Sequence, residues 1–302
     1  MKSKKIILGS RGSKLALIYA ERAREKILNF YPEVEIKIIT TTGDINQKGR
    51  LSEIGGKGLF LKQIENELLN EKIDVAIHAL KDMPSEETNG LLTSCFLERN
   101  DPREVLISYN NNTIKNLKTN SMIGTSSFRR EFQLKKIRSD LNYKLIRGNV
   151  DTRIKKLNDK LYDAIILSYA GIQSLKLEKN VSQFFSTDEI IPSVGQGVVA
   201  LQCRKNDPKI IKLLNKINHK ATNICVLAER QLLKVLDGDC DTAVGAIANI
   251  ENKNIKLKAE LFSIDGKKKF YHIASKDVSF PIELGKEVGE ILKKESKNSY
   301  KR

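Results

Sequence analysis

Two short segments combine glycine, hydroxyl residues and arginine in a way that suits anion binding. Residues 124–130 read GTSSFRR, and residues 145–153 read LIRGNVDTR. Arginine is scarce in this chain, with 14 residues against 39 lysines, and its planar fork binds carboxylates or phosphates in a bidentate way that lysine cannot. Together with GSRGS near the N-terminus, these segments supply five arginines to one predicted anion-binding site: Arg11, Arg129, Arg130, Arg147 and Arg153.

The hydroxyl residues of these segments, Ser13, Thr125 and Ser127, also have a structural explanation. A serine or threonine directly before a helix is most often an N-cap. The adjacent Arg129 and Arg130 oppose the helix dipole at a predicted helix start, which argues against a purely structural role. Taken together with the arginines, the hydroxyls are predicted to meet an anion at the positive end of the helix.

Asp82 follows Lys81 in the segment HALKDMP. Taken alone, the two residues would form a surface ion pair, or Asp82 would cap the following turn. Among arginines a carboxylate has another use, because it can stabilise a cationic intermediate and transfer protons. Asp82 is therefore the predicted catalytic group.

Cys240 is the one cysteine in a polar loop, LDGDCDTAVG. The other three, Cys95, Cys203 and Cys225, lie in apolar strands or a helix and are predicted to be buried thiols. No CxxC spacing suggests a zinc site or a disulfide framework. Two flanking carboxylates should raise the pKa of the Cys240 thiol, so slow and permanent attachment suits it better than fast nucleophilic catalysis.

The elements that position these residues follow from the alternation of apolar strands with helical periodicity. Apolar strands are predicted at 4–10, 33–40 and 73–80, and the alternation restarts after Asn100-Asp101-Pro102. Such alternation predicts parallel sheets with right-handed crossovers. Ligands bind at the C-terminal ends of such strands, and the arginine segments and Asp82 all fall there. The sequence therefore predicts an α/β fold with an anion-binding cleft between two lobes.

Three domains are predicted. Residues 1–99 with 196–218 form the first, because IPSVGQGVVALQCR opens as a hinge and continues as a strand that returns to the first sheet. Residues 103–192 form the second α/β domain. Residues 220–302 form a small α+β domain whose strands alternate as in an antiparallel sheet. The final SKNSYKR is predicted to fray.

The net charge of +16 raises nucleic acid as a possible partner. Much of this charge is lysine spread over surfaces, the arginines lie at strand ends, and aromatic and basic residues do not interleave. A nucleic-acid binder is therefore not favoured. No apolar run approaches the roughly 20 residues that cross a bilayer, and the apolar IIL near the N-terminus is too short for a signal peptide. The sequence predicts a cytoplasmic protein.

Motifs along about residues 6–245 resemble the porphobilinogen deaminase (hydroxymethylbilane synthase) family of haem biosynthesis. In order, they are GSRGSKLAL, GGKGLF, HALKDMP, GTSSFRR, RGNVDTR, YDAIIL, PSVGQG and LDGDC. The set is specific because several motifs keep their spacing over most of the chain. The C-terminal strands and helix fit the family's third domain with little identity.

The resemblance implies two periplasmic-binding-protein-like (type II) α/β lobes around a cleft, plus a small α+β C-terminal domain. It implies a transferase that condenses four porphobilinogen molecules head to tail, with loss of ammonia, onto a dipyrromethane cofactor. The linear tetrapyrrole hydroxymethylbilane is then released by hydrolysis. The implied partners are porphobilinogen and the growing polypyrrole, and the implied state is a monomer.

Residue roles are also implied by the resemblance. Cys240 is the position that matches the thioether tether, and Asp82 matches the acid that assists loss of the aminomethyl nitrogen and stabilises the azafulvene cation. Cofactor contacts are implied for Lys81, Asp82, Thr125, Ser127, Arg129 and Arg130. Substrate contacts are implied for Arg11, Ser13, Arg147, Arg153, Gln196 and, in a predicted mobile loop at 43–58, Lys57.

The sequence departs from the family pattern at Lys14, Glu53, Ala79, Ser174 and Asp239. Glu53 and Ser174 stand where a positive charge is common, so we expect an active enzyme with altered rates for the later additions. A two-lobed anion- or solute-binding protein without catalysis is the alternative. Such a protein has no need for Cys240 and usually carries a secretion signal or a DNA-binding domain, neither of which is visible here.

Overall fold

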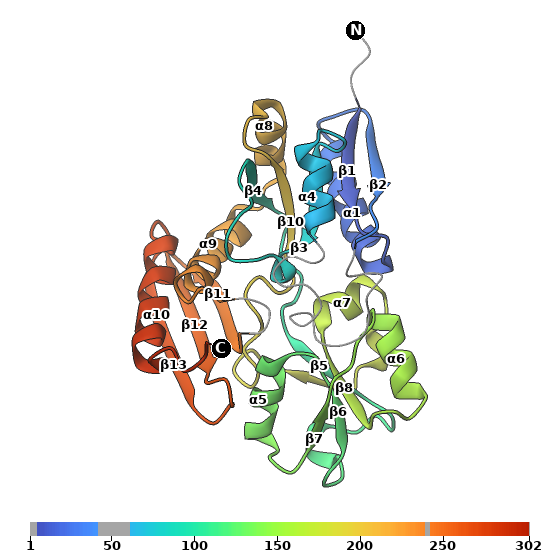
Figure 1. Ribbon diagram of the computed structural model, residues 1–302, viewed down its shortest axis with the longest axis vertical. Helices are drawn as coiled ribbons and strands as arrows, with labels where there is room; N and C mark the ends of the chain where they lie inside the picture. Colours follow the sequence, from blue (N-terminus) through green and yellow to red (C-terminus); the bar gives the residue numbers. More distant parts are fainter. Residues whose placement is uncertain (1–4, 42–60, 239–241, 302) are drawn as a thin grey trace.

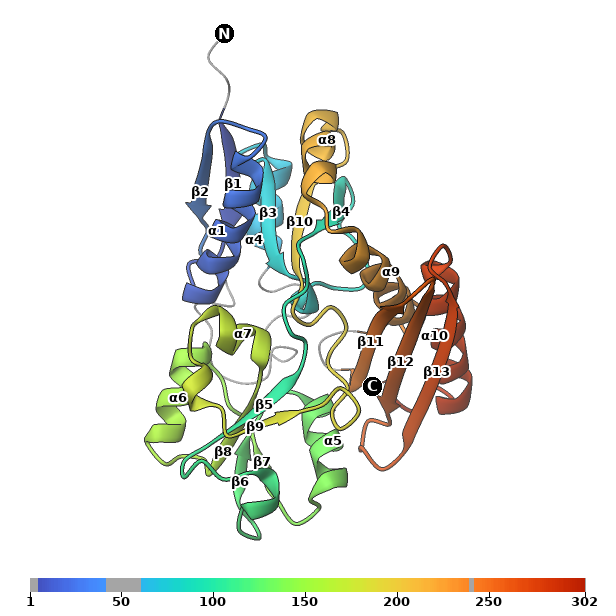
Figure 2. The same cartoon turned by 180° about the vertical axis from the view of Figure 1, so that it is seen from behind.

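The computed structural model describes residues 5–41, 61–238 and 242–301. These residues form two α/β lobes, one above the other in Figure 1, and a third unit beside them (Figures 1 and 2). The predicted fold class is confirmed at this level, because two mixed sheets covered by helices are followed by a small antiparallel sheet with helices.

The first lobe is built on a five-stranded sheet with the strand order β2-β1-β3-β10-β4. Its strands are β1 (Ile6–Ser10), β2 (Val34–Ile38), β3 (Val75–Ala79), β4 (Leu91–Phe96) and β10 (Val199–Arg204). Its helices are α1 (Lys14–Leu28), α4 (Lys62–Leu69), α8 (Pro208–Ile217) and the short 3-10 helix η1 (Leu80–Asp82). Buried Ala20, Ala23 and Ile27 of α1 share one core cluster with α8, whereas α4 packs into a separate cluster.

The second lobe repeats this plan with the strand order β7-β6-β8-β5-β9. Its strands are β5 (Glu104–Ser108), β6 (Met122–Gly124), β7 (Asn142–Lys144), β8 (Ala164–Ser168) and β9 (Gln183–Phe185). Its helices are α5 (Phe128–Ile137), α6 (Val150–Asn158) and α7 (Tyr169–Ser174), with the 3-10 helices η2 (Ile114–Asn116) and η3 (Glu178–Asn180). The clusters around Leu134 of α5 and Leu157 of α6 are distinct.

The prediction of parallel sheets is correct for four strands of each lobe, which run in one direction, and wrong for one strand, β10 in the first lobe and β5 in the second. Strand β1 runs parallel to β2 and β3, and β6 runs parallel to β7 and β8. Strand β10 is antiparallel to β3 and β4, and β5 is antiparallel to β8 and β9. Both β5 and β10 enter their sheets from the other lobe rather than through a crossover helix, so the crossover rule does not set their direction.

The third unit is an antiparallel sheet of β11 (Val244–Glu251), β12 (Asn254–Phe262) and β13 (Lys269–Asp277). Its helices are α9 (Lys220–Val235) and α10 (Pro281–Ser296), which share a core cluster with the sheet. The two helices approach closely at Gly285, where an added Cβ would lie 2.2 Å from the Ala228 carbonyl oxygen. The predicted antiparallel strands and last helix are confirmed, while the domain boundaries remain a prediction.

Two linkers join the lobes, one between β4 and β5 and one between β9 and β10 (Figure 2). They are hydrogen-bonded to each other, because Asn100 N donates to Gly197 O at 2.9 Å and Gln196 Nε2 donates to Pro102 O at 2.7 Å. The buried carboxylate of Glu229 in α9 forms a two-pronged pair with Arg99, at 2.7 and 3.0 Å. The same carboxylate accepts hydrogen bonds from Gly195 N and Ala248 N, so it fastens both linkers to the third unit.

The C-terminal segment does not fray as predicted. Tyr300 is only 5% exposed, and its hydroxyl donates to the Leu236 carbonyl at 3.0 Å. The aromatic ring fills the core of the third unit, and this burial outweighs the entropy of a chain end. Within the described ranges, no helix combines the length and apolar character needed to span a membrane.

Candidate functional site

The candidate site lies where the strand ends of the two lobes face each other. In the first lobe a pocket is lined by polar side chains from the ends of β1 and β3 and from α1: Arg11, Ser13, Tyr19, His78 and Asp82. Its apolar lining includes Leu15, Leu61 and Ile77. The structure therefore brings three of the predicted site residues, Arg11, Ser13 and Asp82, into one hollow.

Asp82 ends the 3-10 helix η1 that directly follows β3, and it is exposed. Its charge reaches several neighbours. Burial, together with the Asp82 carboxylate, raises the pKa of Tyr19 to about 12. Burial lowers the pKa of His78, against the opposing effects of Glu65, Gln202 and Asp82. Asp82 is thus an accessible carboxyl group beside buried groups, which suits a residue that exchanges protons with a bound molecule.

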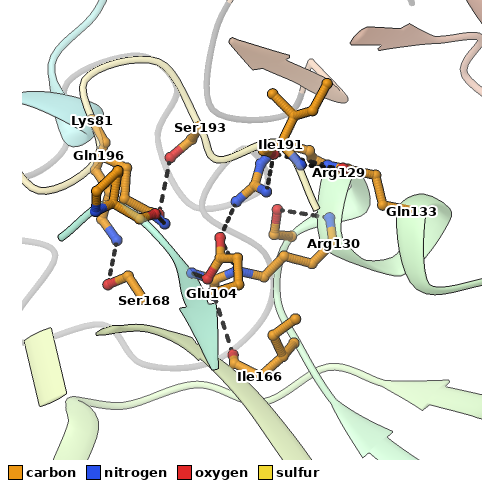
Figure 3. Close-up of polar contacts among 12 residues, drawn as sticks. Lys81, Glu104, Arg129, Arg130, Gln133, Ile166, Ser168, Ile191, Ser193 and Gln196 are labelled. Atoms are coloured by element: carbon orange, nitrogen blue, oxygen red, sulfur yellow. Dashed lines mark hydrogen bonds and ion pairs between the residues drawn. The ribbon is translucent and has the colours of Figure 1, made fainter. Parts of the chain in front are cut away.

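Lys81 points from the first lobe to the second, where its Nζ lies 3.3 Å from the Ser168 hydroxyl at the end of β8 (Figure 3). Burial lowers the pKa of Lys81 to about 8, and the nearby Arg130 and Arg129 act in the same direction. The carboxylates of Asp82 and Glu104 oppose this shift. An anion bound beside Lys81 would favour the protonated form.

Arg147 and Arg153 flank the start of α6 in the second lobe. Gly148 has a φ of +113°, a conformation that favours glycine, and its carbonyl accepts a hydrogen bond from Arg153 Nε at 2.8 Å. Burial lowers the pKa of Arg153 to about 10, as do Arg130 and Arg147, while Asp82 opposes the shift. Among the described residues, neither the Arg147 nor the Arg153 side chain forms an ion pair with a carboxylate.

Arg129 and Arg130 are arranged differently, because both bind the buried carboxylate of Glu104 (Figure 3). Arg129 is 3% exposed and Arg130 is 6% exposed. Their remaining contacts are backbone carbonyls, since Arg129 Nη1 donates to Ile191 O at 2.8 Å and Arg130 Nη1 donates to Ile166 O at 3.2 Å. The paired arginines are thus fixed from within the second lobe rather than left free.

The predicted hydroxyl residues have backbone partners. Ser127 is the N-cap of α5 and accepts from Arg130 N at 3.5 Å, and Thr125 Oγ1 accepts from Ser127 N at 3.2 Å. Ser13 caps α1 by accepting from Ala16 N at 3.4 Å. The capping explanation is therefore correct for Ser13 and Ser127. A hydroxyl that accepts in this way keeps its own proton to donate to an anion.

Gln196 lies apart from the pocket. It is 1% exposed, its amide nitrogen donates to Pro102 O, and its oxygen lies 3.3 Å from the Ser193 hydroxyl. The side chain therefore holds the two linkers together in this structure. Lys57, Cys240 and the predicted mobile loop at 43–58 lie outside the described residues, as do the departures at Glu53 and Asp239.

The remaining three cysteines are buried, as predicted. Burial raises the pKa of Cys95 to about 12 and those of Cys203 and Cys225 to about 11. Such thiols are poor nucleophiles at neutral pH. Among the described residues, no group of three or more histidine, cysteine, aspartate or glutamate side chains could hold a metal ion.

Sequence reasoning missed Tyr19, Glu104 and Ser168. Tyr19 lies within the helical periodicity of α1, where an aromatic residue is expected in the core. Ser168 directly ends the buried strand β8. Glu104 carried the clearest signal, because it is an acidic residue at the head of the apolar strand EVLIS, directly behind the predicted domain break.

The fold and these side chains define a class: a two-lobed α/β protein with cationic groups from both lobes beside one exposed carboxylate. Two family models match the chain. One, described as porphobilinogen deaminase, dipyromethane cofactor binding domain, matches residues 6–212, and the other, porphobilinogen deaminase, C-terminal domain, matches residues 223–294. The chain belongs to the porphobilinogen deaminase family, and the resemblance noted from the motifs is confirmed.

Curated relatives agree with this assignment over nearly the full length. A porphobilinogen deaminase from Staphylococcus epidermidis is 40% identical over 296 residues, covering 97% of this chain and 96% of the relative. One from Syntrophomonas wolfei is 42% identical over 289 residues, covering 94% of each.

Solved structures with weaker similarity include a probable extracellular-binding protein and a VFT2 domain. The probable amino-acid ABC transporter extracellular-binding protein ytmK from Bacillus subtilis aligns with a TM-score of 0.40 and 14% identity, covering 72% of this chain and 90% of that chain. The BvgS VFT2 domain of Bordetella pertussis aligns with a TM-score of 0.44 and 11% identity, covering 70% and 85%. Alignments at this level carry no argument about function.

Proposed function

We propose that this protein is a hydroxymethylbilane synthase that builds a linear tetrapyrrole from four porphobilinogen molecules on a dipyrromethane cofactor attached to Cys240. Family membership over nearly the whole chain supports the reaction. The observation that carries it at the site is the position of Asp82. It is exposed at the end of β3, and its charge acts on Lys81 and on Arg153 from the opposite lobe.

The side chains present fit a polyanionic cofactor. Each ring of a dipyrromethane carries two carboxylates, so a site for it needs several cations that have no carboxylate partner of their own. Arg147 and Arg153 meet this requirement among the described residues, and Lys81 is half-buried with only a serine hydroxyl at hydrogen-bond distance in the same ranges. Arg129 also has a buried Nε–H without a hydrogen-bond acceptor in the described structure.

We assign the cofactor contacts to Lys81, Asp82, Thr125, Ser127, Arg129 and Arg130, and the substrate contacts to Arg11, Ser13, Arg147, Arg153, Gln196 and Lys57. When bound, the cofactor supplies the nucleophilic pyrrole carbon to which the first substrate is joined. The geometry supports Arg11 and Ser13 most directly, because they line the pocket with Asp82. The hydrogen bonds of Gln196 to the linkers make it the weakest of these assignments.

Asp82 acts on the substrate as a proton donor and acceptor. Its carboxyl group donates a proton to the departing aminomethyl nitrogen, and as a carboxylate it stabilises the positive charge that remains on the ring. It later accepts the proton lost from the ring carbon that has formed the new bond. Because one acid serves every addition, the growing chain has to move past Asp82. The pair of linkers between the lobes provides a hinge for such movement.

Cys240 is assigned as the tether by family resemblance and by the properties of the other cysteines. Cys95, Cys203 and Cys225 are buried and have raised pKa values. The chain enters the Cys240 segment from the end of α9, at Gly238, and leaves it toward β11. Along the chain, Cys240 thus lies within the third unit, between α9 and β11.

We also propose that the protein acts in the cytoplasm as a monomer, without nucleic-acid or membrane partners. The positions of the site arginines support the absence of nucleic acid, because Arg129, Arg130 and Arg153 are buried or half-buried at strand and helix ends. The alternative of a two-lobed binding protein without catalysis rests on no observation beyond the shape of the fold.

Intact mass spectrometry of the denatured protein tests the proposed function. Protein purified from cells that make porphobilinogen is expected to carry an adduct of two pyrrole units, localised by peptide mapping to Cys240. The Cys240→Ser variant is expected to lose both adduct and activity, whereas Cys225→Ser, which alters a buried thiol, should keep the adduct. An unmodified wild-type chain, or an adduct on another cysteine, would refute the assignment.

A further inference from the structure

Glu104 occupies the centre of the paired-arginine cluster (Figure 3). Arg129 Nη2 lies 2.6 Å from Glu104 Oε1, Arg130 Nε lies 3.0 Å from the same oxygen, and Arg130 Nη2 lies 2.9 Å from Oε2. The carboxylate is 0% exposed. Burial alone would raise its pKa, but Arg130 and Arg129 outweigh this effect and lower the pKa of Glu104 to about 2. Glu104 is therefore a buried carboxylate whose charge is stabilised by its two arginine partners.

The position of Glu104 in the fold connects the hinge to the site. It is the first residue of β5, directly behind the linker from the first lobe, and it pairs in register with Ser168 of β8. The Ser168 hydroxyl is the partner of Lys81 from the opposite lobe. One end of β5 thus meets the arginine pair, the linker and the lysine contact between the lobes.

The directions of both guanidinium groups follow from this arrangement. Arg129 is held between Glu104 and the Ile191 carbonyl of the return linker, and Arg130 is held between Glu104 and the Ile166 carbonyl of β8. Gln133 also holds Ile191 through two hydrogen bonds. Its Nε2 donates to the Ile191 carbonyl at 3.0 Å, and its Oε1 accepts from Ile191 N at 2.6 Å. Two buried cations balanced by one anion leave one net positive charge beside Lys81. The Nε–H of Arg129 adds a donor that has no acceptor in the described part of the chain.

We propose that Glu104 is a positioning residue for the cofactor site: its carboxylate sets the placement of Arg129 and Arg130 and limits their combined charge, so that the acidic arms of the cofactor meet a prearranged, singly positive unit. This inference rests on the proposed function. It differs from a purely structural role, in which Glu104 would only neutralise buried arginines during folding.

Glu104→Asp tests the geometry, because it keeps the charge and shortens the side chain by one methylene. The matched control is Glu229→Asp, another fully buried carboxylate in a two-pronged arginine pair, with Arg99. Within the described ranges, Glu229 forms no hydrogen bond to a candidate cofactor-binding side chain. Both variants are expected to lose comparable thermal stability. Only Glu104→Asp is expected to reduce the fraction of chains that carry the adduct, and to raise the KM for porphobilinogen about tenfold, because small misplacements of positioning groups are costly.

Glu104→Gln tests the charge. The charged groups that face Lys81 are Asp82, Arg130, Glu104 and Arg129. Removing the Glu104 charge lowers the pKa of Lys81 further, so the alkaline limb of kcat/KM should move to lower pH in the adduct-bearing fraction. A purely structural role would lower the melting temperature without moving this limb. If Glu104→Gln does not fold, the comparison of Glu104→Asp with Glu229→Asp tests the positioning role by itself.

Each contrary result is informative. Wild-type adduct loading and KM in Glu104→Asp, equal losses in Glu104→Asp and Glu229→Asp, or an unmoved alkaline limb in a folded Glu104→Gln would overturn the positioning role. Tighter substrate binding by Glu104→Gln would also overturn it, because Glu104 would then be a competitor of the bound carboxylates. A wild-type chain without the adduct would instead refute the proposed function itself.

Discussion

The two acidic residues of the site, Glu104 and Asp82, differ in their exposure to solvent. Glu104 is fully buried between two guanidinium groups, so it stays ionised and holds its partners in place. Asp82 is exposed at the end of η1, where water and substrate can reach its carboxyl group. The same chemical group thus serves as a fixed counter-ion in one place and, in the proposed function, as a proton-transfer group in the other.

Replacement of Asp82 by asparagine should nearly stop turnover. A positioned acid–base group contributes about 10²–10⁴-fold to a rate, so kcat of Asp82→Asn should fall by about that factor while the circular dichroism spectrum and melting temperature stay the same. Glu86→Gln is the control, because Glu86 is an exposed acid four residues along the chain, and its ion pair with Lys234 is at the surface. A kcat for Asp82→Asn within a few-fold of wild type would remove Asp82 from the mechanism.

At the scale of elements, the site depends on how helices begin. Helix α5 starts at its Ser127 cap with the arginine pair in its first turn, and α6 starts behind Gly148 with Arg153 in its first turns. Because each helix is packed against its own side of the sheet, the beginning of the helix is fixed at the strand ends. The packing of α5 and α6 therefore fixes the positions of Arg129, Arg130 and Arg153.

Gly148→Ala should disturb the start of α6. The backbone there has a φ of +113°, and an added Cβ would lie 2.7 Å from Thr152 Cγ2. We expect a loss of about 1–3 kcal/mol in the free energy of unfolding and a higher KM, because the Gly148 carbonyl orients Arg153. Urea denaturation and steady-state kinetics measure the two effects.

Gly171→Ala is the matched control in the neighbouring helix α7. Its added Cβ would make an ordinary contact, 3.5 Å from Leu15 Cδ2, so both quantities should stay close to wild type. Wild-type stability and KM in Gly148→Ala would contradict the proposed dependence on the α6 start.

The whole molecule is held together at the linkers and in the third unit. Glu229 joins Arg99, Gly195 and Ala248, and thereby connects α9 with both linkers. At the C-terminal end of α9, the Tyr300 hydroxyl donates a hydrogen bond to the Leu236 carbonyl. The segment that contains Cys240 follows directly after this end of the helix, so the C-terminal residues support the base of the proposed tether.

Truncation of Tyr300 should therefore destabilise the third unit. Tyr300→Phe loses one hydrogen bond and should cost about 1 kcal/mol, whereas Tyr300→Ala also empties a core position and should cost about 3–5 kcal/mol. We expect a lower adduct fraction in Tyr300→Ala than in Tyr300→Phe, measured by intact mass.

Tyr271→Ala provides the comparison, because Tyr271 on β13 is 44% exposed and its loss should stay within about 0.5 kcal/mol. Equal effects of the two alanine variants on stability would show that the C-terminus is not part of the core.

Much of this architecture could be predicted from local patterns. The alternation of strands and helices, the antiparallel third sheet and the burial of Cys95, Cys203 and Cys225 all follow from periodicity and polarity within short windows. The same windows place Asp82 and the arginines at strand ends. The directions of β5 and β10 could not be predicted, because these strands arrive across the linkers rather than through a crossover helix.

The sequence by itself determined which residues lie at the strand ends and which family the chain resembles, because both depend on neighbours along the chain. Only the tertiary structure decided which cations share a carboxylate partner within the protein. Arg129 and Arg130 are matched by Glu104 about 25 positions away, and Gln196 is held by Pro102, 94 positions away. Arg147 and Arg153 have no such carboxylate partner among the described residues. An ion pair depends on distances in space, and residues so far apart in the chain meet only after the sheets have formed.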